Sequence, residues 1–217
     1  MASFLSTTAT LSHTTPLPAG TTTAQALAML SDRAFFLSCD PHMSAYEPIP
    51  PSSLTPPPTL PDTVRSHVRP RPSDASPAGS SSAAEGEDGG GKDEEGEEEP
   101  LAQECYRVTD IVHAIPAGIW DTKVVSTYEF TDIEDGLFVR IRSPMSVTME
   151  TFWRVREAGG GGEVEGSGSG GEKGLELVEE VTMRCSRLLV GIVKGQCEAE
   201  WVKIHAKMVG RLEEGLK

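Results

Sequence analysis

The sequence predicts an α+β fold, in which a curved antiparallel sheet of about seven strands wraps around a long C-terminal helix. Two observations predict it. The last part of the chain carries a strand pattern that runs without a turn signal into a long amphipathic helix, and several strand-like segments joined by short turns precede it. A closing strand followed by a long final helix is typical of a sheet that grips a helix, and such a layout usually encloses a pocket.

The predicted C-terminal helix covers residues 186–215. Its apolar residues recur at spacings of three and four, which places them on one face of a helix. They are Leu189, Val193, Cys197, Trp201, Ile204, Met208 and Leu212. Charged residues occupy the opposite side, and Gly215 is a plausible stop. The apolar stripe could line a ligand cavity, although plain core packing against the sheet is the favoured interpretation.

The first part of the chain predicts a strand, two short helices and a second strand. Residues 3–20 are rich in Thr and Leu and end in a turn with two prolines. Thr22 and Gln25 have the spacing of a capping box, so a helix is expected to begin there. A second short helix holds the apolar residues 35–37, and the segment 43–49 follows as a strand.

Five further strands are expected between the second strand and the final helix. Their candidate segments are 104–115, 122–130, 136–143, 145–156 and 174–185. They are rich in β-branched and aromatic residues and are separated by short turns or, before the last strand, by a glycine-rich loop. The predicted order is therefore strand, two helices, six strands and a long helix.

Two segments are predicted to be inserts rather than parts of the core. Residues 50–100 hold ten of the sixteen prolines and an acidic tract with nine acids and one lysine, which gives eight of the fourteen net negative charges. Such a segment buries too little apolar surface to offset its ordering entropy, so it is expected to be disordered. The glycine-rich stretch 159–174 is expected to be a flexible loop. Residues 1–49 and 101–217 then form one domain.

Composition narrows the classes of partner and the location. The acidic balance and the lack of a basic patch argue against a nucleic-acid partner or an anionic membrane surface. No apolar run approaches the length of a membrane-spanning helix. Residues 1–31 have no charged side chain, so the positively charged region that begins a secretory signal is missing. The four scattered cysteines are expected to be reduced, buried thiols. A cytoplasmic location is expected, with diffusion into the nucleus as a further option.

A resemblance to a known family lies in four short segments: TTPLPAG at 14–20, YRVTD at 106–110, LVEEVTMRC at 177–185 and HAKMVGRL at 205–212. Together they resemble an uncharacterised family of filamentous-fungal proteins within the START-like, or helix-grip, superfamily of lipid-binding and polyketide-cyclase-like domains. The resemblance implies a seven-stranded sheet curled around the C-terminal helix, and a fungal source. It implies no catalytic residues, because that family has no established biochemical role.

Strand alternation identifies the side chains that face the helix. In the strand 145–156 they are Met145, Val147, Met149, Thr151, Trp153 and Val155, and in the last strand Leu175, Leu177, Val181, Met183 and Cys185. Glu179 falls on the same face, where a carboxylate is costly unless it is paired. A bulge or edge position that turns Glu179 to water is the slightly favoured alternative. Tyr106 and Asp110 share a face and could lie near the cavity mouth.

The sequence contains no catalytic motif. There is no phosphate-binding loop, nucleophile elbow or dinucleotide fingerprint. Cys39 and His42 are too few for a metal site, so no metal and no cofactor are predicted. His113 and His205 could act as general bases if they faced a pocket, but His205 is more simply a packed, hydrogen-bonded residue.

Three functions are compatible with this sequence. The leading one is a binding module that holds a lipid or another apolar small molecule between the sheet and the helix. Its candidate contact residues are Glu179, Tyr106, Trp153, Met149, Met183 and Trp201. The second is a cyclase or dehydratase that uses Glu179 with His113 or Tyr106 as acid and base. The third is a protein-interaction module with a filled core, in which the acidic insert or an exposed strand edge contacts the partner.

Overall fold

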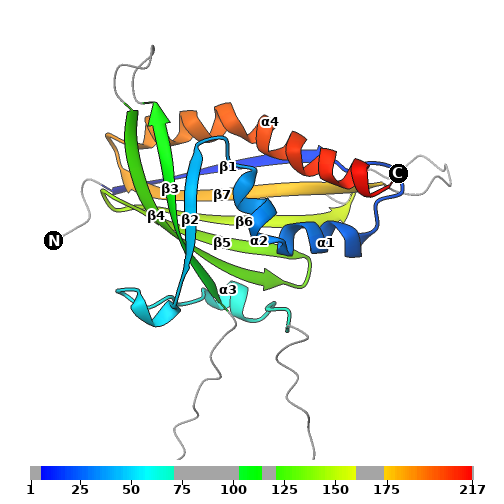
Figure 1. Cartoon of the computed structure of the whole chain (residues 1–217), viewed down its shortest axis with the longest axis horizontal. Helices are drawn as coiled ribbons and strands as arrows, with labels where there is room; N and C mark the ends of the chain where they lie inside the picture. The colour runs from blue at the N-terminus through cyan, green and yellow to red at the C-terminus, as the bar shows by residue number, and fades with distance from the viewer. Residues whose placement is uncertain (1–5, 71–102, 114–120, 160–173, 217) are drawn as a thin grey trace, which may run out of the picture.

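The computed structural model describes residues 6–70, 103–113, 121–159 and 174–216 (Figure 1). Within these residues seven strands form one antiparallel sheet in the order β1-β7-β6-β5-β4-β3-β2. The strands are β1 (Ser6–Pro16), β2 (Met43–Ile49), β3 (Glu104–His113), β4 (Asp121–Ile133), β5 (Gly136–Ser143), β6 (Val147–Glu157) and β7 (Leu175–Ser186). The helices are α1 (Thr23–Ser31), α2 (Arg33–Ser38), α3 (Asp62–Arg65) and α4 (Val190–Gly215), with a 3₁₀ turn at Pro51–Ser53. The predicted fold class is confirmed.

The first strand pairs with the last one along its whole length. The β1–β7 register runs from Ser6 opposite Ser186 to Pro16 opposite Glu176, without a shift. Because β6 lies on the other side of β7, β7 is an interior strand of the sheet. The pairing brings residues 160 to 180 positions apart in the sequence into contact, and it places His13 directly opposite Glu179.

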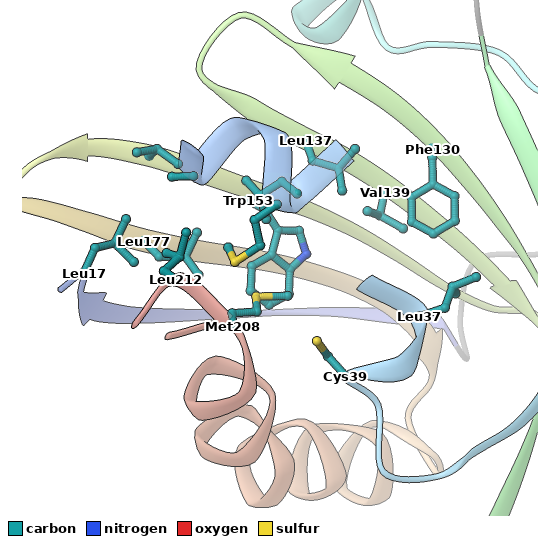
Figure 2. Close-up of a cluster of buried hydrophobic side chains, with 14 of the residues drawn as sticks. Leu17, Leu37, Cys39, Phe130, Leu137, Val139, Trp153, Leu177, Met208 and Leu212 are labelled. Carbon is teal, nitrogen blue, oxygen red and sulfur yellow. The ribbon is translucent and has the colours of Figure 1, made fainter. Parts of the chain in front are cut away.

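Helices α1, α2 and α4 lie on one face of the sheet and build the main core with it (Figure 1). Helix α1 begins at the predicted capping box: the Gln25 amide donates to Thr22 Oγ1 at 3.2 Å, and the Thr22 amide donates to Gln25 Oε1 at 2.9 Å. Figure 2 shows the Trp153 ring between the sheet and α4, beside Met208. The predicted apolar stripe therefore does face the sheet.

The buried residues of α4 lie only in its second half. They are His205, Met208 and Leu212. Leu189, Val193, Cys197, Trp201 and Ile204, which belong to the same stripe, lie over a space that the sheet does not fill. Helix α4 is therefore anchored at its C-terminal end and covers a cavity with its N-terminal end.

The opposite face of the sheet is partly covered by the segment 51–70, which corrects the prediction of a disordered insert from residue 50. Leu60 and Val64 are buried against Ile133 and Phe138, and Phe152 and Val68 pack at the edge of this second cluster. Arg140 on β5 donates to the Thr59 carbonyl oxygen, and Arg142 to that of Pro56 at 3.0 Å. Residues 71–100 of the predicted insert, and most of the predicted loop 159–174, lie outside the described residues.

The segment folds back because the outer face of β5 and β6 offers it two neighbouring aromatic rings. The centroids of Phe138 and Phe152 lie 5.1 Å apart. Covering such a pair removes apolar surface from water, which stabilises the fold by roughly 25 cal/mol for each Å² buried.

Among the described residues, no helix has the length and the apolar composition that crossing a bilayer requires.

Candidate functional site

A cavity of about 350 Å³ lies between the inner face of the sheet and the first half of α4. Strands β3 to β7, the end of α2 and the residues after it also contribute to its wall. Most of the lining side chains are apolar, and four are aromatic: Phe36, Tyr128, Trp153 and Trp201. The volume falls within the range of roughly 300–1,000 Å³ that is typical of small-molecule sites.

Four of the six predicted contact residues lie in the cavity wall: Met149, Trp153, Glu179 and Trp201. Met183 is fully buried on β7 and does not belong to the lining residues. Met145, which was predicted to face inward, is 68% exposed in the turn before β6, where its φ angle is 60°. It nevertheless borders the cavity from this turn.

The structure contradicts the placement of Tyr106 at the cavity mouth. Its ring packs edge-on against Phe130, with centroids 5.6 Å apart, and its hydroxyl donates to Glu104 Oε2 at 3.2 Å. Burial, together with the negative charge of Glu104, raises the pKa of the Tyr106 phenol. The Tyr106 hydroxyl is therefore hydrogen-bonded to a neighbouring carboxylate, and Tyr106 is not one of the residues that line the cavity.

Glu179 faces inward, and the slightly favoured alternative of a bulge or edge position is wrong. The residue is 9% exposed and lines the cavity, on an interior strand whose register with both neighbours is continuous. Its Oε2 atom lies 2.8 Å from Nδ1 of His13. Removing a carboxylate from water is costly unless it is paired, and this hydrogen bond to His13 offsets the cost of placing Glu179 in an apolar wall.

His205 on α4 completes a polar cluster behind the cavity wall. Its Nε2 atom lies 3.5 Å from Glu179 Oε2, and its Nδ1 atom is hydrogen-bonded to Thr15 Oγ1 at 2.8 Å. The His205 side chain is packed and hydrogen-bonded, as expected, although Nε2 is buried without a hydrogen-bond partner of good geometry. The His13 ring stacks on Trp201 at 4.7 Å with an angle of 4° between the planes.

A second set of polar groups lies in the cavity wall where β3, the loop after α2 and α4 meet. It consists of Asp40, His42, Asp110 and Glu200. Nε2 of His42 lies 3.7 Å from Glu200 Oε1, and Lys203 Nζ lies 2.9 Å from Glu200 Oε2. Oδ1 of Asp110 is buried without a hydrogen-bond partner.

Burial in the apolar wall raises the pKa values of three groups that line the cavity: Asp110, Tyr128 and Cys197. Burial, with a contribution from the charge of Asp40, raises the pKa of the Asp110 carboxyl to about 6, against the opposing effect of His42. Burial and the negative charges of Asp110 and Asp40 raise the pKa of the Tyr128 phenol well above its usual value. The Cys197 thiol, which also lines the cavity, has its pKa raised to about 11, first by burial and then by Glu179. Cys197 is therefore a poor nucleophile at neutral pH.

The sequence did not single out His13, Asp40 or Glu200 as candidates for the cavity. Strand alternation could have identified His13, because it lies on the same face of β1 as Leu11 and Thr15, and exposure alternates regularly along this strand. The contact with Glu179, in contrast, depends on the pairing of β1 with β7, which no local pattern reveals. The predicted partner His113 ends β3, and its side chain lies outside the described residues.

Metal binding was not predicted, and the part of the chain that the structure describes offers no cluster of three His, Cys, Asp or Glu side chains that could hold an ion. All four cysteines are free, and three of them are buried.

Comparison with known proteins supports one assignment. A family model described as "Domain of unknown function (DUF7053)" matches residues 6–214. The match begins with β1 and reaches the last turn of α4, so it includes every strand and helix of the described fold. No curated protein matches the chain.

Proposed function

We propose that this chain, which belongs to the DUF7053 family, binds an apolar small molecule of lipid-like character in the cavity under α4. The proposal includes the START-like, helix-grip assignment, which the seven-stranded antiparallel sheet and the C-terminal helix support. The fungal source implied by the resemblance stays a prediction, as does a cytoplasmic location.

The cavity itself is the observation that carries the proposal. A water-sized group occupies about 30 Å³, so the cavity volume of 350 Å³ holds about twelve such groups. This is enough for a medium-length alkyl chain or a small ring system. Apolar walls with a few polar groups are typical of ligand sites that fix the orientation of an amphipathic molecule. Glu179 and Asp110 are such polar groups.

The cavity disfavours the alternative of an interaction module with a filled core, because that alternative requires side chains to occupy this space. The acidic tract, one of the two features on which that function could depend, lies outside the described residues. The alternative of acid–base catalysis keeps one supporting observation, since Glu179 is held next to His13 and His205, whereas the hydroxyl of the predicted partner Tyr106 bonds to Glu104.

As a second candidate, Glu179 therefore exchanges a proton with a carbonyl compound in the cavity, and His13 and His205 position the carboxylate. The test is deuterium incorporation next to the carbonyl of decan-2-one in D₂O, compared between the wild-type protein and Glu179→Gln. Incorporation that depends on Glu179 supports this chemistry. Incorporation at the rate of the buffer alone leaves binding as the function.

The experiment that tests the binding proposal is native mass spectrometry of the purified protein, followed by organic extraction and identification of any small molecule that co-purifies. A mass increment that disappears on extraction, and an extracted compound with an apolar body, would support binding. A protein that carries nothing and shows no mass shift or thermal stabilisation with added apolar compounds would contradict it.

A further inference from the structure

We infer that the cavity selects a hydrophobic amine in its protonated form, with the ammonium group at Asp110 and the apolar body between the sheet and α4. This inference rests on the proposed function, because it names the chemical class of the ligand for the same cavity. It follows from the charges, the unpaired groups and the aromatic rings of the lining residues.

The first step is the sign of the charges in the wall. Four carboxylates line the cavity: Asp40, Asp110, Glu179 and Glu200. Among the described lining residues none is Lys or Arg, and His42 is the one basic side chain. A fatty acid or another anion would bring a further negative charge to this wall at close range, where partial burial weakens the screening of like charges by water.

The second step is to ask which carboxylates are already paired. Glu179 is hydrogen-bonded to His13, and Glu200 lies 2.9 Å from Lys203 Nζ. Asp110 Oδ1 and Glu200 Oε2 are both buried without a hydrogen-bond partner of good geometry. Glu200 nevertheless has the cation Lys203 beside it, whereas the basic group that acts on the charge of Asp110 is His42. Burial and Asp40 together disfavour the ionised form of Asp110. A cationic donor would satisfy the Asp110 oxygen, whereas a neutral apolar ligand would leave it unpaired.

The third step is the aromatic wall close to Asp110. Tyr128 is near enough to Asp110 and Asp40 for their charges to raise the pKa of its phenol, so the ring and the carboxylates belong to the same part of the site. Trp201 and Phe36 also line the cavity. Aromatic faces attract ammonium groups, most strongly where water is excluded. Carboxylates and aromatic faces therefore favour the same ligand charge.

The test compares three ligands that share a ten-carbon chain: decylamine, decan-1-ol and decanoate, titrated calorimetrically at pH 7.5 below their aggregation concentrations. We expect decylamine to bind at least about tenfold more tightly than decan-1-ol, and decanoate to bind most weakly, because a hydrogen bond to a charged group contributes about 1.5–3 kcal/mol. Decanoate binding as tightly as decylamine would overturn the inference.

A variant locates the charge effect. Asp110→Asn keeps the shape of the side chain and removes its charge, and it is expected to weaken decylamine binding about tenfold while changing decan-1-ol binding less than twofold. The matched control is Glu214→Gln, which makes the same charge change at the exposed far end of α4 and is expected to leave both affinities unchanged. Unchanged decylamine affinity in Asp110→Asn would contradict the assignment of the ammonium group to Asp110.

The outcomes separate the inference from the proposed function. If decan-1-ol binds and decylamine binds no more tightly, the cavity is a ligand site and the inference about charge is wrong. If none of the three compounds binds, the proposed function itself fails. Should Asp110→Asn not fold, as judged by circular dichroism, Glu200→Gln provides a second carboxylate of the same set with the same expected direction.

Discussion

The Glu179 carboxylate on β7 lies 2.8 Å from the Nδ1 atom of His13, the residue directly opposite it on β1. The pair joins the first strand to the last one at the wall of the cavity. The stacking of the His13 ring on Trp201 extends the contact to α4. One side chain of β1 therefore fixes both a polar group of the cavity and an aromatic residue above it.

Replacing His13 by Ala is expected to destabilise the protein by about 2–3 kcal/mol. The variant removes the hydrogen bond to Glu179 and the stack on Trp201, and it leaves the carboxylate with only the longer contact to His205. Urea denaturation, followed by tryptophan fluorescence, measures the change in the free energy of unfolding.

His67→Ala is the control for this experiment. His67 also faces a glutamate, with 3.6 Å between its Nδ1 and Glu134 Oε2, but its side chain is 58% exposed. Exposed pairs contribute little, so the expected change is below about 0.5 kcal/mol. Equal effects of the two substitutions would show that burial of the His13–Glu179 pair has no energetic consequence.

Asp110→Asn is expected to raise stability at pH 8 and not at pH 4. The pKa of the Asp110 carboxyl is about 6 in the folded protein and about 3.9 in an unfolded chain, with Asp40 and His42 as its charged neighbours. A raised carboxyl pKa contributes stability that is present in full below the unfolded pKa and is lost as the pH rises through the folded pKa. Asn does not undergo this loss.

The expected gain of Asp110→Asn at pH 8, relative to the wild-type protein, is about 1–2 kcal/mol after allowing for partial solvent access. Denaturant titrations at pH 4, 6 and 8 measure it. A difference between the two proteins that is the same at all three pH values would contradict the raised pKa of Asp110.

How far the sequence predicts this fold depends on whether the signal is local. The capping box at Thr22 and the spacing of apolar residues in α4 are local, and both are confirmed. Strand alternation likewise identified Met149 and Trp153 as inward-facing residues. The strand 43–49 was predicted with the bounds that β2 has in the structure.

The failures concern contacts between distant parts of the chain. Tyr106 has the parity of an inward residue, but its ring packs against Phe130 on the neighbouring strand β4. Asp40 and Glu200 line the same cavity, because the chain after α2 and the helix α4 both lie on this face of the sheet. The proline-rich composition of the segment led to a prediction of disorder, so the burial of Leu60 and Val64 was missed. Their partners Phe138 and Ile133 lie more than 65 residues further along the chain. The neighbouring Phe138 and Phe152 on the outer face could have indicated that a segment covers this side of the sheet.

Val64→Ala is expected to destabilise the protein by about 1–2 kcal/mol, because Val64 is fully buried against the outer face of the sheet. The control is Thr63→Ala, at the exposed neighbouring position of α3, with an expected change below about 0.5 kcal/mol. Thermal denaturation compares the two variants. If Val64→Ala has no larger effect than Thr63→Ala, the segment 51–70 does not contribute to the folded domain.

The most direct test of the cavity as a ligand site is calorimetric titration of decan-1-ol into the wild-type protein, Val193→Trp and Val202→Trp. Both valines lie on α4, but Val193 lines the cavity whereas Val202 is 55% exposed. We expect the wild-type protein and Val202→Trp to bind with the same affinity, and Val193→Trp, in which the indole occupies the cavity, to lose binding. No binding to the wild-type protein, or equal binding to all three, would contradict a ligand site under α4.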